Sequence, residues 1–433
     1  MKRPIISAFL QQSTPDRNRL KASAALSDAP VDRSFGNEGY AYLLAQEPKS
    51  AGVCTDILKS HVRQDRYYAC AFQSHKETQV FNSAVWLLDG DGERDHSFTV
   101  DFGSLMEKDK TFIPYSLMED RKGNLLCLGE VSKNPHRLWK FKNTGELDKS
   151  FASTGFIDSD RLTAERLNFR FAAALSDGYV IACHTPDFKT VLVALSPDGT
   201  LKPTFGNEGV LDLESQLPGY GAGITGLIAT THADGSNRVL LLSLRGVGDE
   251  LFSVLSAIDS KGRLDTSFGN NGHFKSENAT FYRGLSCSSV SSLVTLCGGH
   301  MLADESMQPD IIRLTSNGAP DQDFNKGAPV RFDANAGMWH HMIEYEGRLV
   351  GVGSFYNHNR AVRYQADGTL DVTFVSPWGH GAFGAVPPNP GFYMDGNSSI
   401  AFVPASKRLL ICGDVNVTAQ NQVAAAVLAL ALG

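Results

Sequence analysis

The sequence predicts an all-β protein, and more narrowly a seven-bladed β-propeller made of four-stranded antiparallel blades. Three observations predict this class. One short pattern centred on a phenylalanine recurs along the chain, each copy follows the same succession of short apolar runs and turns, and no stretch has the 3.6-residue apolar period of a long helix. Four-stranded sheets repeated around an axis leave few exposed edges, so such a repeat favours a propeller.

The recurring pattern reads Leu/Val-Asp-x-Ser/Thr-Phe in its common form, often followed by Gly-x-x-Gly. Its phenylalanines are 50 to 63 residues apart: Phe35, Phe98, Phe151, Phe205, Phe268, Phe324 and Phe374. Asp and Ser/Thr side chains can cap backbone amides in a hairpin loop, and glycines can adopt conformations closed to other residues. We therefore expect this motif to hold one blade against the next, with its phenylalanine in a pocket between neighbouring sheets.

Each unit supplies four strands. In the first unit we expect them at about Val53–Lys59, Arg66–Phe72, Asn82–Leu88 and Val100–Phe102. The third strand of a unit ends in an Asp-Gly or Asn-Gly pair, which is typical of tight turns. Five of the seven cysteines fall in the same part of the repeat: Cys70, Cys127, Cys183, Cys297 and Cys412. No CxxC pair is present, so we expect reduced cysteines in buried strands and neither a disulfide framework nor a zinc site.

The two ends of the chain predict how the ring closes. The last unit ends on its third strand, at about residues 422–432, and the strand that should follow it occurs only near the start, at about residues 39–44. We expect these two segments to pair and to complete the last blade. Residues 31–433 would then form a single propeller, preceded by an N-terminal arm at residues 1–30.

Composition limits the classes of partner that the protein could bind. The net charge is −7 and the pI is about 5.9, and no basic stripe is present, which argues against a nucleic-acid partner held by phosphate contacts. No stretch reaches the length of an apolar membrane span, and the N-terminus lacks the apolar core of a secretory signal. We expect a cytoplasmic monomer that does not bind membranes.

The motif Leu-Asp-Thr-Ser-Phe-Gly-Asn-Asn-Gly at 264–272 is similar to the repeat of the bacterial delta-60 family, whose repeats resemble propeller blades. The resemblance covers about residues 31–433 and is most specific at Val31–Gly39, Leu201–Gly209 and Leu264–Gly272. At Phe98, Phe324 and Phe374 the Gly-x-x-Gly tail is missing or replaced. The resemblance implies the propeller fold and no defined catalytic chemistry or cofactor.

The sequence contains no HExxH, GxSxG or Walker motif and no GxGxxG that opens a helix. Concave sites in a propeller form where the innermost strands begin and loops converge. Aligned units place these residues there: Thr55, Tyr115, Arg170, Thr225, Tyr282 with Arg283, Trp339 with His340, and Phe392 with Tyr393. Tyr, Trp and Arg often anchor recognition surfaces, so we take this set, apart from the two threonines, as the candidate ligand-binding residues. The alternative is that the rings fill the channel or pack between blades.

Loops on the same face add further polar residues: His136, His184 with Asp187, His300 with Asp304 and Glu305, Tyr356 with His358, and Asp414. His340 and His341 are adjacent on a strand and would point to opposite faces, so only one could serve a given site. A metal site would require His340, His184 and His300 to converge. We assign no metal ligands and expect no cofactor.

Three functions are consistent with these observations. The first is a non-enzymatic binding or scaffold module that recognises a protein, peptide or glycan at the central face, and the absence of catalytic motifs favours it. The alternative is an enzyme, a hydrolase or lyase with a divalent-cation site in the central funnel. The second alternative is a lectin with one site in each blade, which ranks last because the repeated residues have structural roles in turns.

Overall fold

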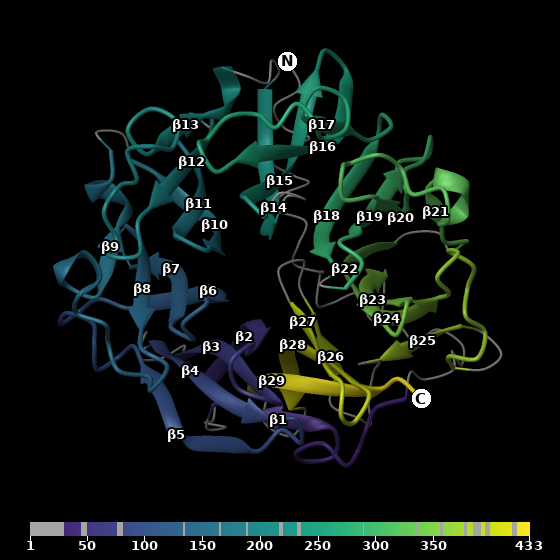
Figure 1. Cartoon of the computed structure of the whole chain (residues 1–433). Helices are drawn as coiled ribbons and strands as arrows, with labels where there is room; N and C mark the ends of the chain where they lie inside the picture. The colour runs from purple at the N-terminus through teal and green to yellow at the C-terminus, as the bar shows by residue number, and fades with distance from the viewer. Residues whose placement is uncertain are drawn as a thin grey trace.

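The computed structural model describes most of the chain after residue 29. The described residues are 30–44, 50–75, 81–132, 135–163, 166–187, 189–215, 220–231, 235–288, 290–333, 337–355, 358–375, 379–383, 391–394, 399–417 and 422–433. Figure 1 shows their sheets arranged as sectors around a central opening, with β2, β6, β10, β14, β18 and β22 nearest the axis. This arrangement is a β-propeller. The expected N-terminal arm at residues 1–30 lies outside the described residues, apart from Pro30.

Three sheets of four antiparallel strands occur in the described part of the chain. The first contains β6 (Phe112–Glu119), β7 (Leu125–Val131), β8 (His136–Phe141) and β9 (Phe156–Asp158). The second contains β10 (Asn168–Leu175), β11 (Gly178–His184), β12 (Thr190–Leu195) and β13 (Val210–Asp212). The third contains β22 (Gly337–Tyr345), β23 (Arg348–Phe355), β24 (His358–Tyr364) and β25 (His380–Phe383).

Two larger sheets complete the described strands. One holds β14 (Tyr220–Thr231), β15 (Asn237–Val247), β16 (Glu250–Asp259), β17 (His273–Lys275), β18 (Thr280–Cys287), β19 (Val294–Met301), β20 (Met307–Leu314) and β21 (Val330–Arg331). The other holds β1 (Tyr40–Tyr42), β2 (Ser50–Lys59), β3 (Arg66–His75), β4 (Phe81–Asp89), β5 (Arg94–Asp101), β26 (Gly391–Tyr393), β27 (Ile400–Val403), β28 (Arg408–Val417) and β29 (Gln422–Ala431). Within each, two groups of strands meet at one pair of opposed residues, Phe252 with Thr280 and Ala51 with Val423.

The helices of the described residues are single 3-10 turns. They are η1 (Phe151–Ser153), η2 (Ser159–Arg161), η3 (Leu213–Ser215) and η4 (Asn325–Gly327). None of them is long or apolar enough to span a membrane.

The first unit shows how closely the sequence pattern follows the strands. The predicted strands correspond to β2, β3 and β4, each extended by a few residues. The fourth prediction, Val100–Phe102, was wrong in its start, because β5 already begins at Arg94 and takes in the motif. This copy of the motif lacks the Gly-x-x-Gly tail, and the segment stays extended where other copies turn through positive φ, as at Gly36 and Gly39.

Middle strands read as unbroken apolar runs because both of their faces are covered by neighbouring sheets. Leu240, Leu241 and Leu242 of β15 are all fully buried. Leu241 packs into the core shared with β10–β13, whereas Leu240 and Leu242 pack into the core shared with β18–β20. The two-residue period of a strand thus divides one run between two cores.

The N-terminal and C-terminal strands are antiparallel neighbours. Tyr40 lies opposite Leu428 and Tyr42 lies opposite Ala426, which places β1 beside β29. The two segments are those for which pairing was expected, residues 39–44 and 422–432 (Figure 1).

The motif aspartate has two roles. One carboxylate oxygen accepts hydrogen bonds from the Ser or Thr two residues later, as Asp371 does from the Thr373 amide at 3.1 Å and its hydroxyl at 2.6 Å. The other oxygen pairs with a cation from a neighbouring strand. Arg363 Nε lies 2.7 Å from Asp371 Oδ2, and the guanidinium lies over the ring of Phe374 at 5.1 Å.

The same cation reaches the next group of strands. Arg313 pairs with Asp321 at 2.6 Å and donates to the Ala366 carbonyl at 2.8 Å, in the turn that follows β24. Arg408 does the same between Asp32 at 2.6 Å and the Gly90 carbonyl at 2.8 Å. Each such cation therefore ties a motif to the turn of its neighbour.

The motif phenylalanine completes this contact. All seven rings are buried, with exposed fractions of 0–2%. Phe268 lies against Gly318 of the next turn, where a Cβ would come within 2.7 Å of the ring, and Gly318 has a φ of +81° that favours glycine. The expected pocket for the phenylalanine between neighbouring sheets is confirmed by these contacts.

The motif offers a matched pair of substitutions. Phe374→Ala should lower the free energy of unfolding by about 3–5 kcal/mol, because it removes a buried ring and leaves a cavity. Val372→Ala, two residues earlier and 53% exposed, should change it by less than about 0.5 kcal/mol. Urea unfolding followed by tryptophan fluorescence measures both, and equal shifts would contradict the assigned role of the ring.

Candidate functional site

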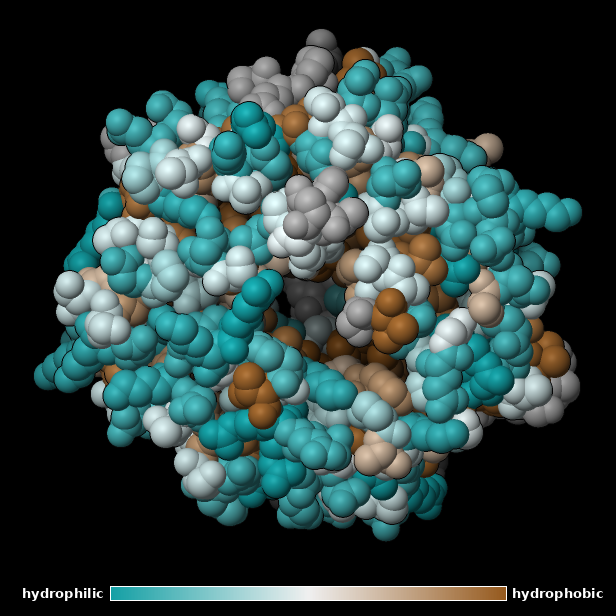
Figure 2. Space-filling view, in the orientation of Figure 1, coloured by the Kyte–Doolittle hydropathy of each residue, from teal (hydrophilic) through white to brown (hydrophobic). Residues whose placement is uncertain are grey.

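The innermost strands share one irregularity. In six described inner strands the register with the second strand slips by one residue, which is a β-bulge. The residues skipped at equivalent positions, which we call the bulge residues, are Thr55, Tyr115, Arg170, Thr225, Arg283 and His340. These positions are the ones that aligned units predicted as the entries to the inner strands. Figure 2 shows that the ring is hollowed at its axis, which these strands surround.

A bulge leaves one residue outside the ladder and re-aims its side chain. Three of the bulge residues use a hydroxyl to reach the next inner strand. Thr55 donates to the Pro114 carbonyl at 2.8 Å, and Thr225 donates to the Tyr282 carbonyl at 3.1 Å. Both acceptors directly precede the bulge of the next strand, so these bonds link successive bulges around the opening.

Tyr115 makes the third bond of this kind. Its hydroxyl donates to the Phe169 carbonyl at 2.7 Å and also lies 2.7 Å from Nδ1 of His136. Because a carbonyl oxygen only accepts, the phenol proton belongs to the bond with Phe169, and Nδ1–H of His136 donates to the phenol oxygen. Nε2 of His136 is then left as a proton acceptor. Burial raises the pKa of Tyr115 well above its usual range.

Arg170 and Arg283 occupy the bulge position without a hydroxyl. Arg170 is exposed and Arg283 is half-buried. No Asp or Glu of the described residues forms an ion pair with Arg170. Burial, with a contribution from the Arg170 charge, lowers the pKa values of His136 and His184 to about 4. Arg170 therefore lies among neutral imidazoles and a phenol.

His340, the sixth bulge residue, is buried and contacts two neighbouring strands. Its Nε2 lies 2.6 Å from the Ser354 hydroxyl. Burial, then Arg283 and His341, lowers the pKa of His340 to about 3. A side chain at Gly284 would come within 2.3 Å of the His340 carbonyl, so glycine is required after Arg283 for the two strands to approach.

Two of the predicted aromatic residues do not line an open mouth. Trp339 is fully buried and packs against Phe332 and Phe355 at ring distances of 5.5 Å and 5.3 Å. Tyr282 is 2% exposed and donates to Asp310 at 2.7 Å. Both residues directly precede a bulge, and their side chains point into the cores between sheets. For these two positions the alternative of packing between blades is correct.

The seventh predicted position, Phe392 with Tyr393, is on β26, whose side chains lie outside the described residues. Its backbone pairs with β28, with Tyr393 opposite Asp414. β27 pairs with the same strand further along, so β26 and β27 together take the place of one inner strand.

The three histidines that a metal site would require, His184, His300 and His340, each contact a different partner. His184 accepts from the Ile224 amide at 3.1 Å, His300 lies 2.9 Å from the Thr280 hydroxyl, and His340 contacts Ser354. The residues that the structure describes contain no group of three or more His, Cys, Asp or Glu side chains that could hold a metal ion. The carboxylates of Asp187 and Asp304 bond to hydroxyls in their own loops, Thr185 and Ser306.

The sequence missed the cations that pair with the motif. The signal was present, since a Lys or Arg stands near the end of the apolar third strand at Lys140, Arg313 and Arg363. The sequence also could not show that the aligned entry positions are bulges, because a bulge is defined by the register with the partner strand.

Comparisons with known proteins concern the fold. Residues 347–374 match the model of a β-propeller domain of unknown function, DUF5122. No curated protein matches the chain. Among solved structures, the polysaccharide lyase Uly1 is 9% identical with a TM-score of 0.47, covering 96% of this chain and all of that one. The β-propeller domain of the Trilobed protease from Pyrococcus furiosus is 7% identical with a TM-score of 0.45, covering 89% of this chain and 94% of that one.

The buried histidines predict how stability depends on pH. Their folded pKa values of about 4 for His184 and about 3 for His340 lie below the ordinary value of 6.5. As the pH falls below 6.5 the unfolded chain takes up protons first, so the free energy of unfolding should decrease between pH 6.5 and 4. His184→Gln and His340→Gln should each make this decrease smaller. The urea concentration at the midpoint of unfolding, measured across this pH range, tests the prediction. If the midpoint depends on pH as steeply in both variants as in the wild type, the prediction is refuted.

Proposed function

We propose that the chain is a closed seven-bladed propeller of the delta-60 repeat type. Dividing the two large sheets at their single bridges leaves seven groups, each with one strand at the axis: β2–β5, β6–β9, β10–β13, β14–β17, β18–β21, β22–β25, and β26 to β29 with β1. The antiparallel pair of β1 and β29 supports closure of the last group. Contacts of the motif continue across this junction, from Phe35 to Gly92 and from Arg363 to the Leu432 carbonyl.

We propose further that the protein is a binding module, which holds an acidic protein, peptide or glycan over the central channel. The observation that carries this proposal is Arg170. It occupies the position where other strands place a hydroxyl that bonds to the next sheet, yet it is exposed and has no carboxylate partner among the described residues. Arg283 occupies the same position in β18.

The chemistry of this position suits a carboxylate. A guanidinium presents a planar fork of donors that matches a carboxylate in a bidentate way. The two histidines beside Arg170 are neutral at pH 7. Nε2 of His184 accepts from the Ile224 amide, so its Nδ1–H can donate to a carboxylate, whereas the N–H of His136 is already committed to Tyr115. An acidic ligand would therefore find one cation with polar neighbours at the rim of a hollow axis.

Arg170→Ala should weaken binding of polygalacturonate or poly-L-glutamate at least tenfold, since a charge-assisted hydrogen bond contributes about 1.5–3 kcal/mol. Arg170→Lys should retain part of the affinity. Retardation in native gels that contain these polymers, with neutral dextran as the blank, measures the effect.

Arg33→Ala serves as the control, because this side chain is 76% exposed in the loop before β1. If the variants at Arg170 and Arg33 are retarded equally, the channel face is not the binding site.

A second candidate is an enzyme, and the contact between Tyr115 and His136 favours it. With Nδ1–H committed to the phenol oxygen, Nε2 of His136 can accept a proton. A neutral base beside a guanidinium is suited to removing a proton next to a carboxylate, whose charge the guanidinium would offset. The electron pair of the broken C–H bond would form a double bond as the β-substituent leaves with its own bonding pair.

The same incubation separates the two candidates. A lyase would convert polygalacturonate into chains with unsaturated ends, which absorb in the ultraviolet, and His136→Gln would stop this while leaving binding largely intact. Binding without any such product supports the binding module.

A further inference from the structure

A second cation without a carboxylate lies in the sheet of β22–β25. Arg360 on β24 is 8% exposed. One of its terminal nitrogens lies 3.1 Å from Nε2 of His358, and its guanidinium lies over the rings of Phe355 at 4.7 Å and Phe332 at 5.7 Å. Its Nε has no hydrogen-bond partner. No Asp or Glu in the described ranges forms an ion pair with it.

Comparison with another sheet shows which partner Arg360 lacks. Lys140 of β8 and Arg363 of β24 are the cations that pair with the motif, so the residues three positions earlier, Arg137 and Arg360, are equivalent. Arg137 lies opposite Asp158 and forms a bidentate ion pair with it, at 2.6 Å and 2.9 Å.

In β22–β25 the residue opposite Arg360 is Ala382. This sheet has the arginine and the flanking aromatic rings, but no carboxylate lies opposite the arginine.

The strands β20 and β21 also carry a complete charge pair at this position. In β20, the residue three positions before Arg313 is Asp310, and the residue opposite it is Arg331. They form an ion pair at 3.0 Å, with the two charges exchanged relative to Arg137 and Asp158. Two sheets thus balance the charge at this position internally, whereas Arg360 is left unbalanced.

A buried cation without a counter-ion is costly, and contacts with aromatic rings offset only part of that cost. The segments that adjoin these four strands in the sequence and lie outside the described residues, 334–336, 356–357, 376–378 and 384–390, contain no Asp or Glu. A carboxylate supplied from outside the chain would complete the pair.

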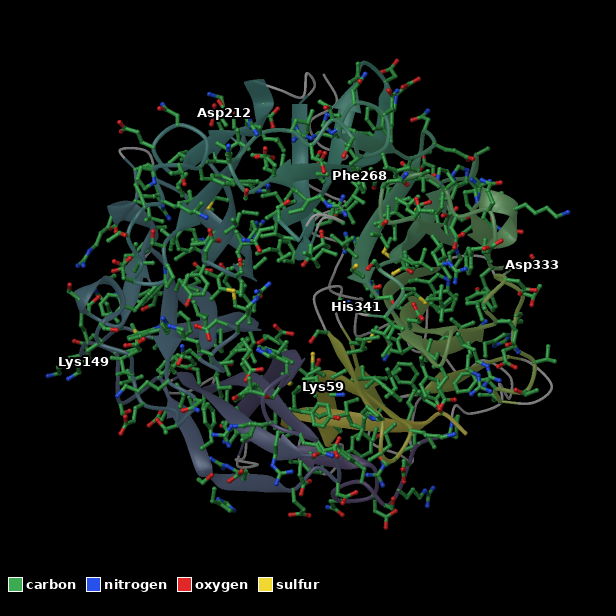
Figure 3. All side chains as sticks on the ribbon, viewed as in Figure 1. Lys59, Lys149, Asp212, Phe268, Asp333 and His341 are labelled. Atoms are coloured by element: carbon green, nitrogen blue, oxygen red, sulfur yellow. The ribbon has the colours of Figure 1, made fainter. Side chains whose placement is uncertain are left out.

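A cleft lies on Phe332, the ring that the guanidinium of Arg360 contacts. It has a volume of about 360 Å³, and its lining includes Phe332, Tyr364 and His380. Phe332 connects the two features, because its ring contacts both the guanidinium of Arg360 and the imidazole of His380, the latter at 5.0 Å. Figure 3 places Asp333, another lining residue, at the outer part of the ring, whereas His341 lies near the axis. The cleft is therefore separate from the channel mouth.

Two imidazoles can donate to an anion here: His358, which contacts Arg360, and His380, which lines the cleft. Burial, together with the charge of Arg360, lowers the pKa values of His358 and His380 to about 4, so both are neutral at pH 7 and each carries one N–H. Arg331, which lines the cleft, is already engaged by Asp310 and Glu277. The charge available to a ligand is that of Arg360.

We propose that Arg360, with His358 and His380, binds the carboxylate of a small organic acid whose apolar or aromatic body occupies the cleft beside Phe332. This site is independent of the channel mouth and of the function proposed for it.

Benzoate and its uncharged analogue benzamide are suitable probes. Titration calorimetry of the full-length protein should show benzoate binding at least tenfold tighter than benzamide. Arg360→Met should reduce benzoate affinity at least tenfold, while Arg33→Met should leave it unchanged. Equal binding of the two probes, or benzoate binding retained by Arg360→Met, would overturn the proposal.

Ala382→Asp provides a second measurement that does not depend on removing the arginine. It restores the acid found opposite Arg137, so it should raise the melting temperature and abolish benzoate binding. Ala382→Asn introduces a side chain of the same size without the charge. It should raise the melting temperature less and should weaken benzoate binding less than Ala382→Asp does. If the Asp variant binds benzoate as the wild type does, the carboxylate site is wrongly assigned.

Discussion

The structure depends on one repeated interaction, the motif carboxylate that is shared between a hydroxyl in its own loop and a cation from a neighbouring strand. Asp371 shows it in full, with Thr373 on one oxygen and Arg363 on the other. The cation also covers the motif phenylalanine. Removing Asp371 or Arg363 would leave a buried charge, and removing the ring of Phe374 would leave a cavity. Both are costly. The motif is therefore a joint between successive sheets as well as a turn.

These joints hold the sheets face to face at the outside of the ring, and the bulges organise its inside. Hydroxyls at Thr55, Tyr115 and Thr225 link one bulge to the next. At Arg170 the bulge carries a side chain without a hydroxyl, and this side chain is exposed. The outer strands of two sheets can be compared in the same way, because Arg137 lies opposite Asp158 whereas Arg360 lies opposite Ala382. In both places the candidate site is the repeat whose internal pairing is incomplete.

Much of the fold could be predicted because the motif marks equivalent positions in the chain. The phenylalanine pocket, the first three strands of the first unit and the pairing of the terminal segments all follow from comparing copies. The orientation of Trp339 and Tyr282 could not be predicted, because one skipped residue reverses which face the neighbouring side chains occupy. The unbalanced charge of Arg360 was also invisible, since only the strand register shows that Ala382 lies opposite it.

We propose that the joints carry the chain around one axis until β1 and β29 pair. Tyr42 and Ala426 are directly opposed between β1 and β29, and they form a pair without mutual backbone hydrogen bonds because Leu43 bonds to Ala425. At such a pair cysteines are close enough to form a disulfide. Oxidation of the Tyr42→Cys, Ala426→Cys variant, followed on non-reducing gels, should give a closed species of altered mobility. The Ala41→Cys, Ala426→Cys variant, whose side chains point to opposite faces, should not. Equal crosslinking of both, or of neither, would contradict the closed ring.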